Sequence, residues 1–201
     1  MENFLNHKKT KNILDFLETL TIALAFCAFI YLTIAFPNKV EGQSMEPTFH
    51  HSDLVITNKT VQYLGNTDFG QSRNYDYHRG DVVIVKQGNT DLIKRIVALE
   101  GEEVEVKNNH VYVNGEELNE EYLPTTVRTK LPSSELSLFR NGAPVTVPES
   151  SYFVMGDNRE HSKDSRFKEI GFISRSNIKG RVIFRYWPLA DIGIVHRGEY
   201  K

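Results

Sequence analysis

Cysteine is nearly absent from this chain of 201 residues: Cys27 is the only one, and it lies inside an apolar stretch near the N-terminus. The rest of the chain therefore cannot contain a disulfide, and we expect it to be stabilised by packing alone. An excess of positive charge is missing as well, since 24 Lys and Arg residues stand against 26 Asp and Glu residues. This near-neutral balance predicts no nucleic-acid-binding surface.

Metal-binding patterns are missing too. His, Cys, Asp and Glu residues occur at no spacing that is typical of a zinc or other metal site. We therefore expect neither a metal nor another cofactor. The chain also lacks internal repeats and low-complexity tracts, so no repeat architecture is predicted.

One long apolar run is present, and it extends from Thr19 to Pro37 without a charged residue. Nineteen helical residues at about 1.5 Å per residue reach roughly 28 Å, close to the hydrocarbon thickness of a bilayer. Lysines precede the run at positions 8, 9 and 11, so the positive-inside rule places the N-terminus in the cytoplasm. We expect a single-pass protein with a cytoplasmic tail (1–18), a transmembrane anchor (19–37) and an extracytoplasmic domain (38–201).

A cleaved signal peptide is the alternative interpretation of this run. Its small-residue cleavage pattern is missing, because bulky residues and a proline occupy Ile34-Ala35-Phe36-Pro37. A lipid-modified Cys27 is disfavoured because Phe26 precedes it where a small residue is needed. An uncleaved anchor in the lipid bilayer is therefore the preferred interpretation.

Beyond the run, the apolar pattern has a period of two and predicts a mainly antiparallel β fold. Strands are expected at 81–85, 92–99, 151–155 and 180–187, and a hairpin is expected around Asn114-Gly115. No amphipathic helix of useful length is predicted there. Residues from about 105 to 148 are expected to form a small cap, whose part from Leu123 to Pro148 is rich in proline and weakly periodic.

Ser44 is the first candidate for chemistry. It follows Gly42 by two residues, and Pro47 biases Glu46 away from helical angles. A serine held in such a turn can attack a carbonyl while its own N–H stabilises the oxyanion. Taken alone the signal is weak, because most serines in Gly-x-Ser turns have no catalytic role.

Lys94 is the second candidate, because it lies in an apolar strand. Alternation places it on one face with Leu92 and Ile96, while Arg95 lies on the other face with Ile93. A free lysine has a pKa of about 10.4, so its deprotonation at pH 7 costs about 4.6 kcal/mol. Burial lowers this pKa, and a value near 8 would leave roughly a tenth of the amines neutral and basic. In the alternative interpretation the side chain extends to the surface and is solvated.

A third segment, from Gly156 to Arg166, crowds polar groups into a loop after an apolar strand. A hydroxyl in this loop could orient the lysine amine, and Asp164 could pair with Arg166. Orientation of the base by a third group is the general rule for activated nucleophiles.

Together, four segments in this order after an apolar run resemble the bacterial type I signal peptidases, which are serine endopeptidases that remove signal peptides from exported preproteins. The segments are Ser44-Met45-Glu46-Pro47-Thr48, Gly80-Asp81-Val82-Val83, Lys94-Arg95-Ile96-Val97 and Gly156 to Arg166. The resemblance extends from the apolar run to about Arg185 and is closest to the short, single-span members.

This resemblance implies a β-rich catalytic core of the kind shared with self-cleaving repressor proteases, together with a variable cap. It implies that Ser44 is the nucleophile, Lys94 the general base, and Ser162 the residue that orients the lysine. The residues that would support the loop are Arg95, Asp157, Asp164 and Arg166. The implied partners are secretory preproteins with Ala-x-Ala before the cut, and the implied location is the bacterial cytoplasmic membrane.

Two positions depart from the family pattern. Gly42 stands where some relatives carry a serine whose hydroxyl helps to bind the oxyanion. Ala98-Leu99-Glu100-Gly101 replaces the more usual Gly-x-Pro-Gly after the lysine segment.

Three alternatives remain at this point. His161 adjoins Ser162 and could serve as the base of a Ser44–His161–Asp triad. A self-cleaving regulator is the nearer functional alternative, although the apolar run argues against it. An inactive anchored β domain that only binds secretion partners is the more distant one, and the presence of both Ser44 and Lys94 argues against it.

Overall fold

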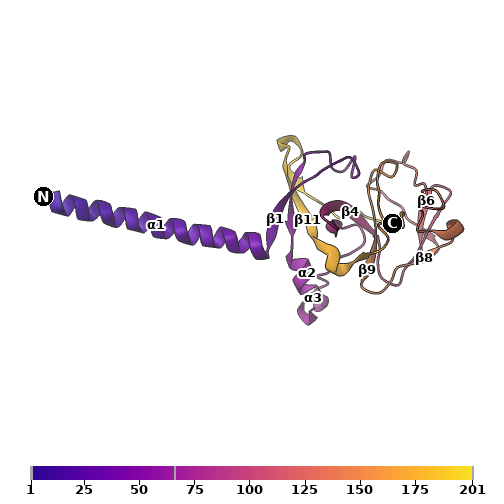
Figure 1. Ribbon diagram of the computed structural model, residues 1–201, viewed down its shortest axis with the longest axis horizontal. Coiled ribbons are helices and arrows are strands. Elements are labelled where there is room, and N and C mark those ends of the chain that lie inside the picture. The colour runs from indigo at the N-terminus through magenta and orange to yellow at the C-terminus, as the bar shows by residue number, and fades with distance from the viewer. Residues whose placement is uncertain (1, 66, 201) are drawn as a thin grey trace.

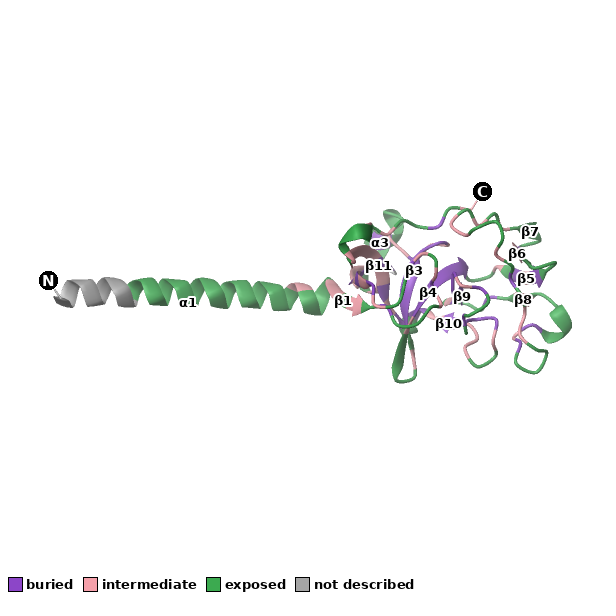
Figure 2. Ribbon diagram, turned by 90° about the horizontal axis from the view of Figure 1, so that it is seen from above, coloured by how far each residue is buried: buried purple, intermediate pink, exposed green. Residues whose placement is uncertain are grey.

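The computed structural model describes residues 2–65 and 67–200, without the side chains of residues 2–10. Its first element is the long helix α1 (Glu2–Thr33), which extends away from a β-rich domain (Figure 1). Lys11–Thr33 is long and apolar enough to cross a membrane, and its most apolar stretch is not buried. From Lys11 to Phe29 the helix is exposed (Figure 2), and its residues from Thr19 on carry no charge, which suits a lipid environment.

The helix ends before the end of the apolar run that was expected to form the anchor. The sequence run continues to Pro37, but the helix ends at Thr33, and Ala35–Lys39 form a strand instead. This strand pairs antiparallel with the next one, from Ala35 opposite Asn58 to Lys39 opposite Leu54. An apolar pattern cannot locate this change, because residues suited to a membrane helix also suit a half-buried strand. The wider division into tail, anchor and exported domain remains a prediction.

The first sheet of the described residues contains eight strands in the order β1-β2-β11-β3-β4-β9-β10, with β12 paired to β11. All of its pairings are antiparallel. The strands are β1 (Ala35–Lys39), β2 (Leu54–Asn58), β3 (Val82–Gln87), β4 (Thr90–Ala98), β9 (Ser151–Met155), β10 (Ile173–Ser174), β11 (Ile178–Trp187) and β12 (Gly193–Ile194).

The second sheet lies at the end of the domain away from α1 (Figure 1). In the described residues it has the order β7-β6-β5-β8. Its strands are β5 (Glu103–Lys107), β6 (His110–Val113), β7 (Glu116–Glu117) and β8 (Val145–Thr146). Its hairpins turn at Asn108-Asn109 and Asn114-Gly115, which all have positive φ and are residue types that tolerate it. The predicted mainly antiparallel β fold is therefore confirmed.

Short helices complete the described part of the chain. They are α2 (Thr60–Leu64), α3 (Asp68–Ser72), η1 (Arg140–Gly142), η2 (Arg175–Asn177) and η3 (Leu189–Asp191). All of them are only three to five residues long. They therefore agree with the prediction that no amphipathic helix of useful length follows the apolar run.

The apolar residues of β3 and β4 separate into different packing clusters on the two faces of the first sheet. Val83 and Ile96 belong to one cluster, while Val82 and Ile93 belong to another. A third cluster, which includes Val104 and Phe153, joins the two sheets. Because the second half of β4 runs through this packing, its polar residues Lys94 and Arg95 are buried with the apolar ones.

Candidate active site

Ser44 lies in the turn region between β1 and β2. Its neighbour Met45 and nearby Phe49 are buried and fix the segment to the core, while Ser44 itself is half-buried. Gly42 has φ of +81°, a conformation that favours glycine. Its N–H donates to Nδ1 of His51 at 3.1 Å. The apolar anchors and the glycine together hold the serine hydroxyl at the surface of the sheet.

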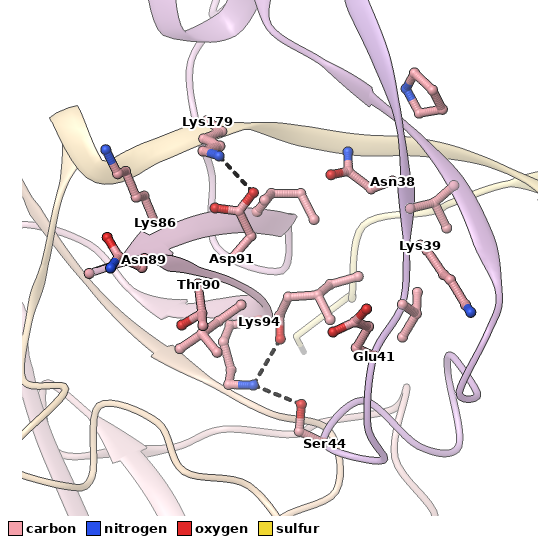
Figure 3. Close-up of a pocket in the computed structure, with 17 residues that line it drawn as sticks. Asn38, Lys39, Glu41, Ser44, Lys86, Asn89, Thr90, Asp91, Lys94 and Lys179 are labelled. Atoms are coloured by element: carbon pink, nitrogen blue, oxygen red, sulfur yellow. Dashed lines mark hydrogen bonds and ion pairs between the residues drawn. The ribbon is translucent and has the colours of Figure 1, made fainter.

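Lys94 reaches Ser44 from β4. Its Nζ lies 2.7 Å from the Ser44 Oγ and also donates to the carbonyl oxygen of Ile93 at 2.9 Å (Figure 3). Only 3% of Lys94 is exposed. The structure thus brings together the two residues that the sequence analysis selected, although they are 50 positions apart.

The surroundings of Lys94 tune its basicity. Burial lowers the pKa of Lys94 from 10.5 to about 8. The nearby carboxylates of Asp164 and Asp157 act in the opposite direction and raise this pKa, but burial has the larger effect. At this pKa roughly a tenth of the amines are neutral at pH 7. The neutral amine has a lone pair that can accept the Ser44 hydroxyl proton at hydrogen-bonding distance. The pair has the geometry and the basicity of a nucleophile with its general base.

Two buried ion pairs hold the loop formed by residues 156–166. Arg95 donates from Nε and Nη2 to the Asp157 carboxylate at 2.9 and 2.7 Å. Arg166 donates in the same way to Asp164 at 2.8 and 2.9 Å. Burial alone would raise the pKa of Asp164, but the bonds from Arg166 lower it overall, so the carboxylate stays ionised. Charges this deeply buried need such two-point pairing, because an unpaired partner would be costly.

The same loop touches the serine segment directly. Asn158 N–H donates to the Ser44 carbonyl oxygen at 3.1 Å. A Cβ on Gly156 would overlap that carbonyl oxygen and the Ser162 side chain, so only glycine fits there. Ser162 Oγ is buried, yet it has no hydrogen-bond partner among the described residues. The expected bond from Ser162 to Lys94 is therefore not made in this structure, and its orienting role remains a prediction.

A second network of hydrogen bonds, which the sequence analysis did not predict, connects the loop of residues 156–166 to the cap. Arg159 donates to both carboxylate oxygens of Glu120 and to the Tyr122 hydroxyl. The Tyr122 ring lies under the Arg95 guanidinium, 4.1 Å from its centroid, and its hydroxyl is 3.1 Å from that of Tyr200. Arg159 stands inside a recognised motif, but Glu120, Tyr122 and Tyr200 lie in segments without periodic signal.

Histidine does not reach the serine hydroxyl by any contact among the described residues. His161 is exposed, and its Nδ1 lies 3.3 Å from the Asn158 Oδ1. His51 contacts the backbone of Gly42 rather than the Ser44 side chain. Within the same residues, no three His, Cys, Asp or Glu side chains gather in a group that could hold a metal ion.

A cleft of about 660 Å³ opens beside the Ser44–Lys94 pair (Figure 3). Its lining includes the buried side chains of Val55, Ile84 and Ile93 together with several charged side chains. Two of the charged ones, Lys179 and Asp91, form an ion pair at 2.6 Å. The cleft therefore places apolar side chains near the candidate nucleophile.

Comparison with known proteins identifies the family of this chain. Residues 13–187 match the family described as signal peptidase, peptidase S26. Signal peptidase I S of Bacillus subtilis (strain 168) is 35% identical over 187 residues, covering 93% of this chain and 96% of that protein. Signal peptidase IB of Staphylococcus aureus (strain COL) is 31% identical over 189 residues, covering 90% and 93%.

Among solved structures, a signal peptidase I from Enterococcus faecalis V583 is 30% identical and has a TM-score of 0.42, covering 53% of this chain and 96% of that one. The family match extends over most of the chain, and it confirms the family that the four sequence segments indicated. This chain belongs to the signal peptidase family, peptidase S26, and is a serine peptidase.

Proposed function

We propose that this protein is a membrane-anchored endopeptidase that removes signal peptides from exported preproteins, with Ser44 as nucleophile and Lys94 as general base. The observation that carries the proposal is the 2.7 Å contact between the Ser44 Oγ and the Nζ of a lysine that is 3% exposed. Family membership and the names of the relatives support the substrate class.

In the acylation step, neutral Lys94 accepts the Ser44 proton while Oγ attacks the scissile carbonyl carbon. The tetrahedral oxyanion then collapses, the C–N bond breaks, and the Lys94 ammonium returns the proton to the leaving amine. The signal peptide is left as an ester on Ser44. In the second step Lys94 takes a proton from water, the resulting hydroxide attacks the ester carbon, and Ser44 leaves with the proton restored.

The ion pairs have a positioning role in this proposal. Arg95–Asp157 and Asp164–Arg166 fix the loop that contacts the Ser44 backbone, so they keep the nucleophile in line with Lys94. Correct placement of reacting groups accounts for a large share of enzymatic rate enhancement. Ser162 is assigned the role of orienting the amine, for which a rotation of its buried, unpartnered Oγ toward Lys94 would be required.

We assign Ala-x-Ala specificity to the cleft beside Ser44. Val55, Ile84 and Ile93 in its lining suit small apolar side chains, and the cleft borders both Ser44 and Lys94. Hydrophobic pockets separate side chains that differ by one methylene only modestly, about 10–200-fold. A preference for small residues is therefore expected to be strong only against bulky ones.

The proposed topology has the N-terminus in the cytoplasm and the catalytic domain outside. Helix length and hydropathy over Lys11–Thr33 support a single crossing. Lysines at positions 8, 9 and 11 support the orientation through the positive-inside rule. The structure does not describe the side chains at positions 8 and 9.

The test is cleavage of a signal-peptide substrate with Ala-x-Ala before the cut, by the full chain in detergent, with the new N-terminus mapped. Ser44→Ala and Lys94→Ala should each abolish cleavage, and replacing either substrate alanine by phenylalanine should slow it strongly. Retained cleavage in Lys94→Ala would refute the assigned base. For the topology, protease added outside spheroplasts should cut within residues 123–148 and spare residues 8–11, and the reverse pattern would contradict it.

A further inference from the structure

The last described residues of the chain return from β12 to the core of the catalytic domain. We call residues 195–200 the C-terminal strap. It begins where the Val195 N–H donates to the Ile183 carbonyl oxygen of β11 at 2.9 Å. Among the described residues, the strap lines no part of the cleft beside Ser44, and the family match ends before it, at residue 187. Any contribution of the strap to catalysis therefore acts through other residues.

Gly198 brings the strap into contact with Arg95, the residue next to the candidate base. Its N–H donates at 3.0 Å to the Gly80 carbonyl oxygen, which also accepts from Arg95 Nη1 at 2.8 Å. A Cβ on Gly198 would lie 2.7 Å from the Tyr122 ring and 3.1 Å from Arg95 Nη1, so the strap backbone approaches both closely. The strap therefore closes one side of the buried Arg95 guanidinium.

Tyr200 contacts two parts of the site at once. Its hydroxyl donates to the Ile96 carbonyl oxygen at 3.3 Å, two residues after Lys94 in β4. Burial raises the pKa of Tyr200, so the hydroxyl stays protonated and can donate. Its ring packs edge-to-face on Tyr122 with the centroids 5.5 Å apart, and the Tyr122 ring in turn lies against the Arg95 guanidinium. Tyr200 thus binds the strand of the base and supports the ring beside Arg95.

Arg197 fixes the strap between these contacts and its beginning. Its Nε donates to Asp81 Oδ1 at 2.9 Å, and its Nη2 lies 2.9 Å from His78 Nδ1. Asp81 is itself buried, and its carbonyl oxygen accepts from the Ile96 N–H of β4 at 2.9 Å. Chain ends are usually poorly ordered unless specific contacts hold them. The bonds of Arg197, Gly198 and Tyr200 hold the strap against the core.

Arg95 connects these contacts to the nucleophile. Its Nη2 donates to the carboxylate of Asp157 in the loop at 2.7 Å. The same carboxylate accepts at 2.6 Å from the hydroxyl of Thr48, four residues after Ser44. A shift of the Arg95 guanidinium would therefore move both the loop and the segment that carries Ser44. Displacing reacting groups by about 1 Å can slow a reaction on the order of 100-fold.

We propose that the C-terminal strap is a positioning element for the Ser44–Lys94 pair and that Tyr200 is its positioning residue. Tyr200 contacts the backbone of β4 directly and Arg95 through the Tyr122 ring, and so keeps the pair in the alignment that catalysis requires. This inference rests on the proposed function of the pair. Because the strap does not line the cleft, its loss should slow the chemical step and leave binding of the preprotein unchanged.

The test compares Tyr200→Phe and Tyr200→Ala with Tyr112→Phe, in the full chain in detergent. Tyr112 is the matched control, because it is also half-buried and its hydroxyl donates to Glu117 at 2.9 Å, but it lies in the second sheet. Cleavage of an Ala-x-Ala substrate gives kcat and KM. We expect kcat to fall roughly 100-fold in Tyr200→Ala and roughly tenfold in Tyr200→Phe, which keeps the ring. KM should stay within about twofold, and Tyr112→Phe should match the wild type.

Hydrogen exchange followed by mass spectrometry gives a second measurement that does not depend on activity. In Tyr200→Ala, peptides from residues 44–49 and 156–166 should exchange faster, because the hydrogen bond that joins these segments loosens. Peptides from residues 103–113, in the second sheet, should exchange as in the wild type. Faster exchange throughout the domain would overturn the inference, because Tyr200 would then only stabilise the fold. Unchanged exchange at 44–49 and 156–166 would overturn it too.

The kinetic outcomes separate this inference from the proposed function. An unchanged kcat in Tyr200→Ala, or equal losses in Tyr200→Phe and Tyr112→Phe, would overturn the positioning role. A higher KM at constant kcat would also overturn it, because the strap would then bind the preprotein. Failure of the wild type to cleave, or cleavage by Lys94→Ala, would instead refute the proposed function, and the exchange measurement would still decide whether the strap holds the two segments.

Discussion

Replacing Lys94 by methionine should make the protein more stable at pH 7 while abolishing catalysis. Burial lowers the pKa of Lys94 from 10.5 to about 8. The unfolded chain therefore holds the Lys94 proton up to about pH 10.5, whereas the folded chain releases it near pH 8. Between these values the unfolded state binds more protons, so the stability of the wild type rises with pH across this window.

The magnitude follows from the same two values. The pKa values of Lys94 in the unfolded and folded chain differ by about 2.5, and at 1.36 kcal/mol per unit this corresponds to roughly 3 kcal/mol. The wild type is destabilised by this amount below pH 8. Methionine fills a similar volume without charge. It loses the bonds to Ser44 and Ile93, which are worth about 1 kcal/mol. We therefore expect Lys94→Met to be more stable than the wild type by roughly 2 kcal/mol at pH 7, with the advantage largely gone by pH 10.

The assay is guanidinium unfolding of the detergent-solubilised chain at pH 7 and pH 10, followed by circular dichroism. Lys86→Met is the matched control, because Lys86 is exposed, and its stability should stay within about 0.5 kcal/mol of the wild type at both values of pH. The reasoning is refuted if Lys94→Met is no more stable than the wild type at pH 7 and the difference between them does not change with pH.

Three further predictions concern the rest of the site. Gly156→Ala should slow cleavage on the order of 100-fold, because the added Cβ would displace the Ser44 backbone. Gly193→Ala is the control and should not change the rate, because a Cβ there meets no atom within 4 Å. Equal activity of the two variants would contradict the close contact between Gly156 and Ser44. Gly42→Ser should lower thermal stability by about 1 kcal/mol without raising kcat, because φ is +81° there; a higher kcat would reveal a missing oxyanion donor. EDTA should leave the rate unchanged, and a loss that zinc restores would indicate a metal enzyme.

Local chemistry made several features predictable from the sequence. Asn114-Gly115 favours positive φ, so the hairpin at this position of the second sheet could be anticipated. The alternation around Lys94 correctly placed a lysine among apolar neighbours, because a strand has a strict period of two. The strand 151–155 was located to the residue, since turn residues bound its apolar run on both sides.

Features that depend on distant contacts could not be predicted in this way. The pairing of Arg159 with Glu120, 39 positions away, depends on how the cap folds back over the loop. Tyr200, whose hydroxyl contacts that of Tyr122, belongs to a segment near the C-terminus that has no apolar periodicity. The helix-to-strand change after Thr33 depends on pairing with β2, which the apolar run does not encode. Helices α2 and α3 are too short to have a periodic pattern of their own.

The pH dependence of cleavage tests the central claim, that neutral Lys94 takes the proton of Ser44, most directly. With the pKa of Lys94 lowered to about 8, kcat/KM should rise about tenfold per pH unit below that value and level off above it. His161→Ala should retain the profile, and Lys94→Arg should have no activity, because arginine stays protonated. A profile centred near pH 6.5 that His161→Ala abolishes, or substantial activity in Lys94→Arg, would contradict the account.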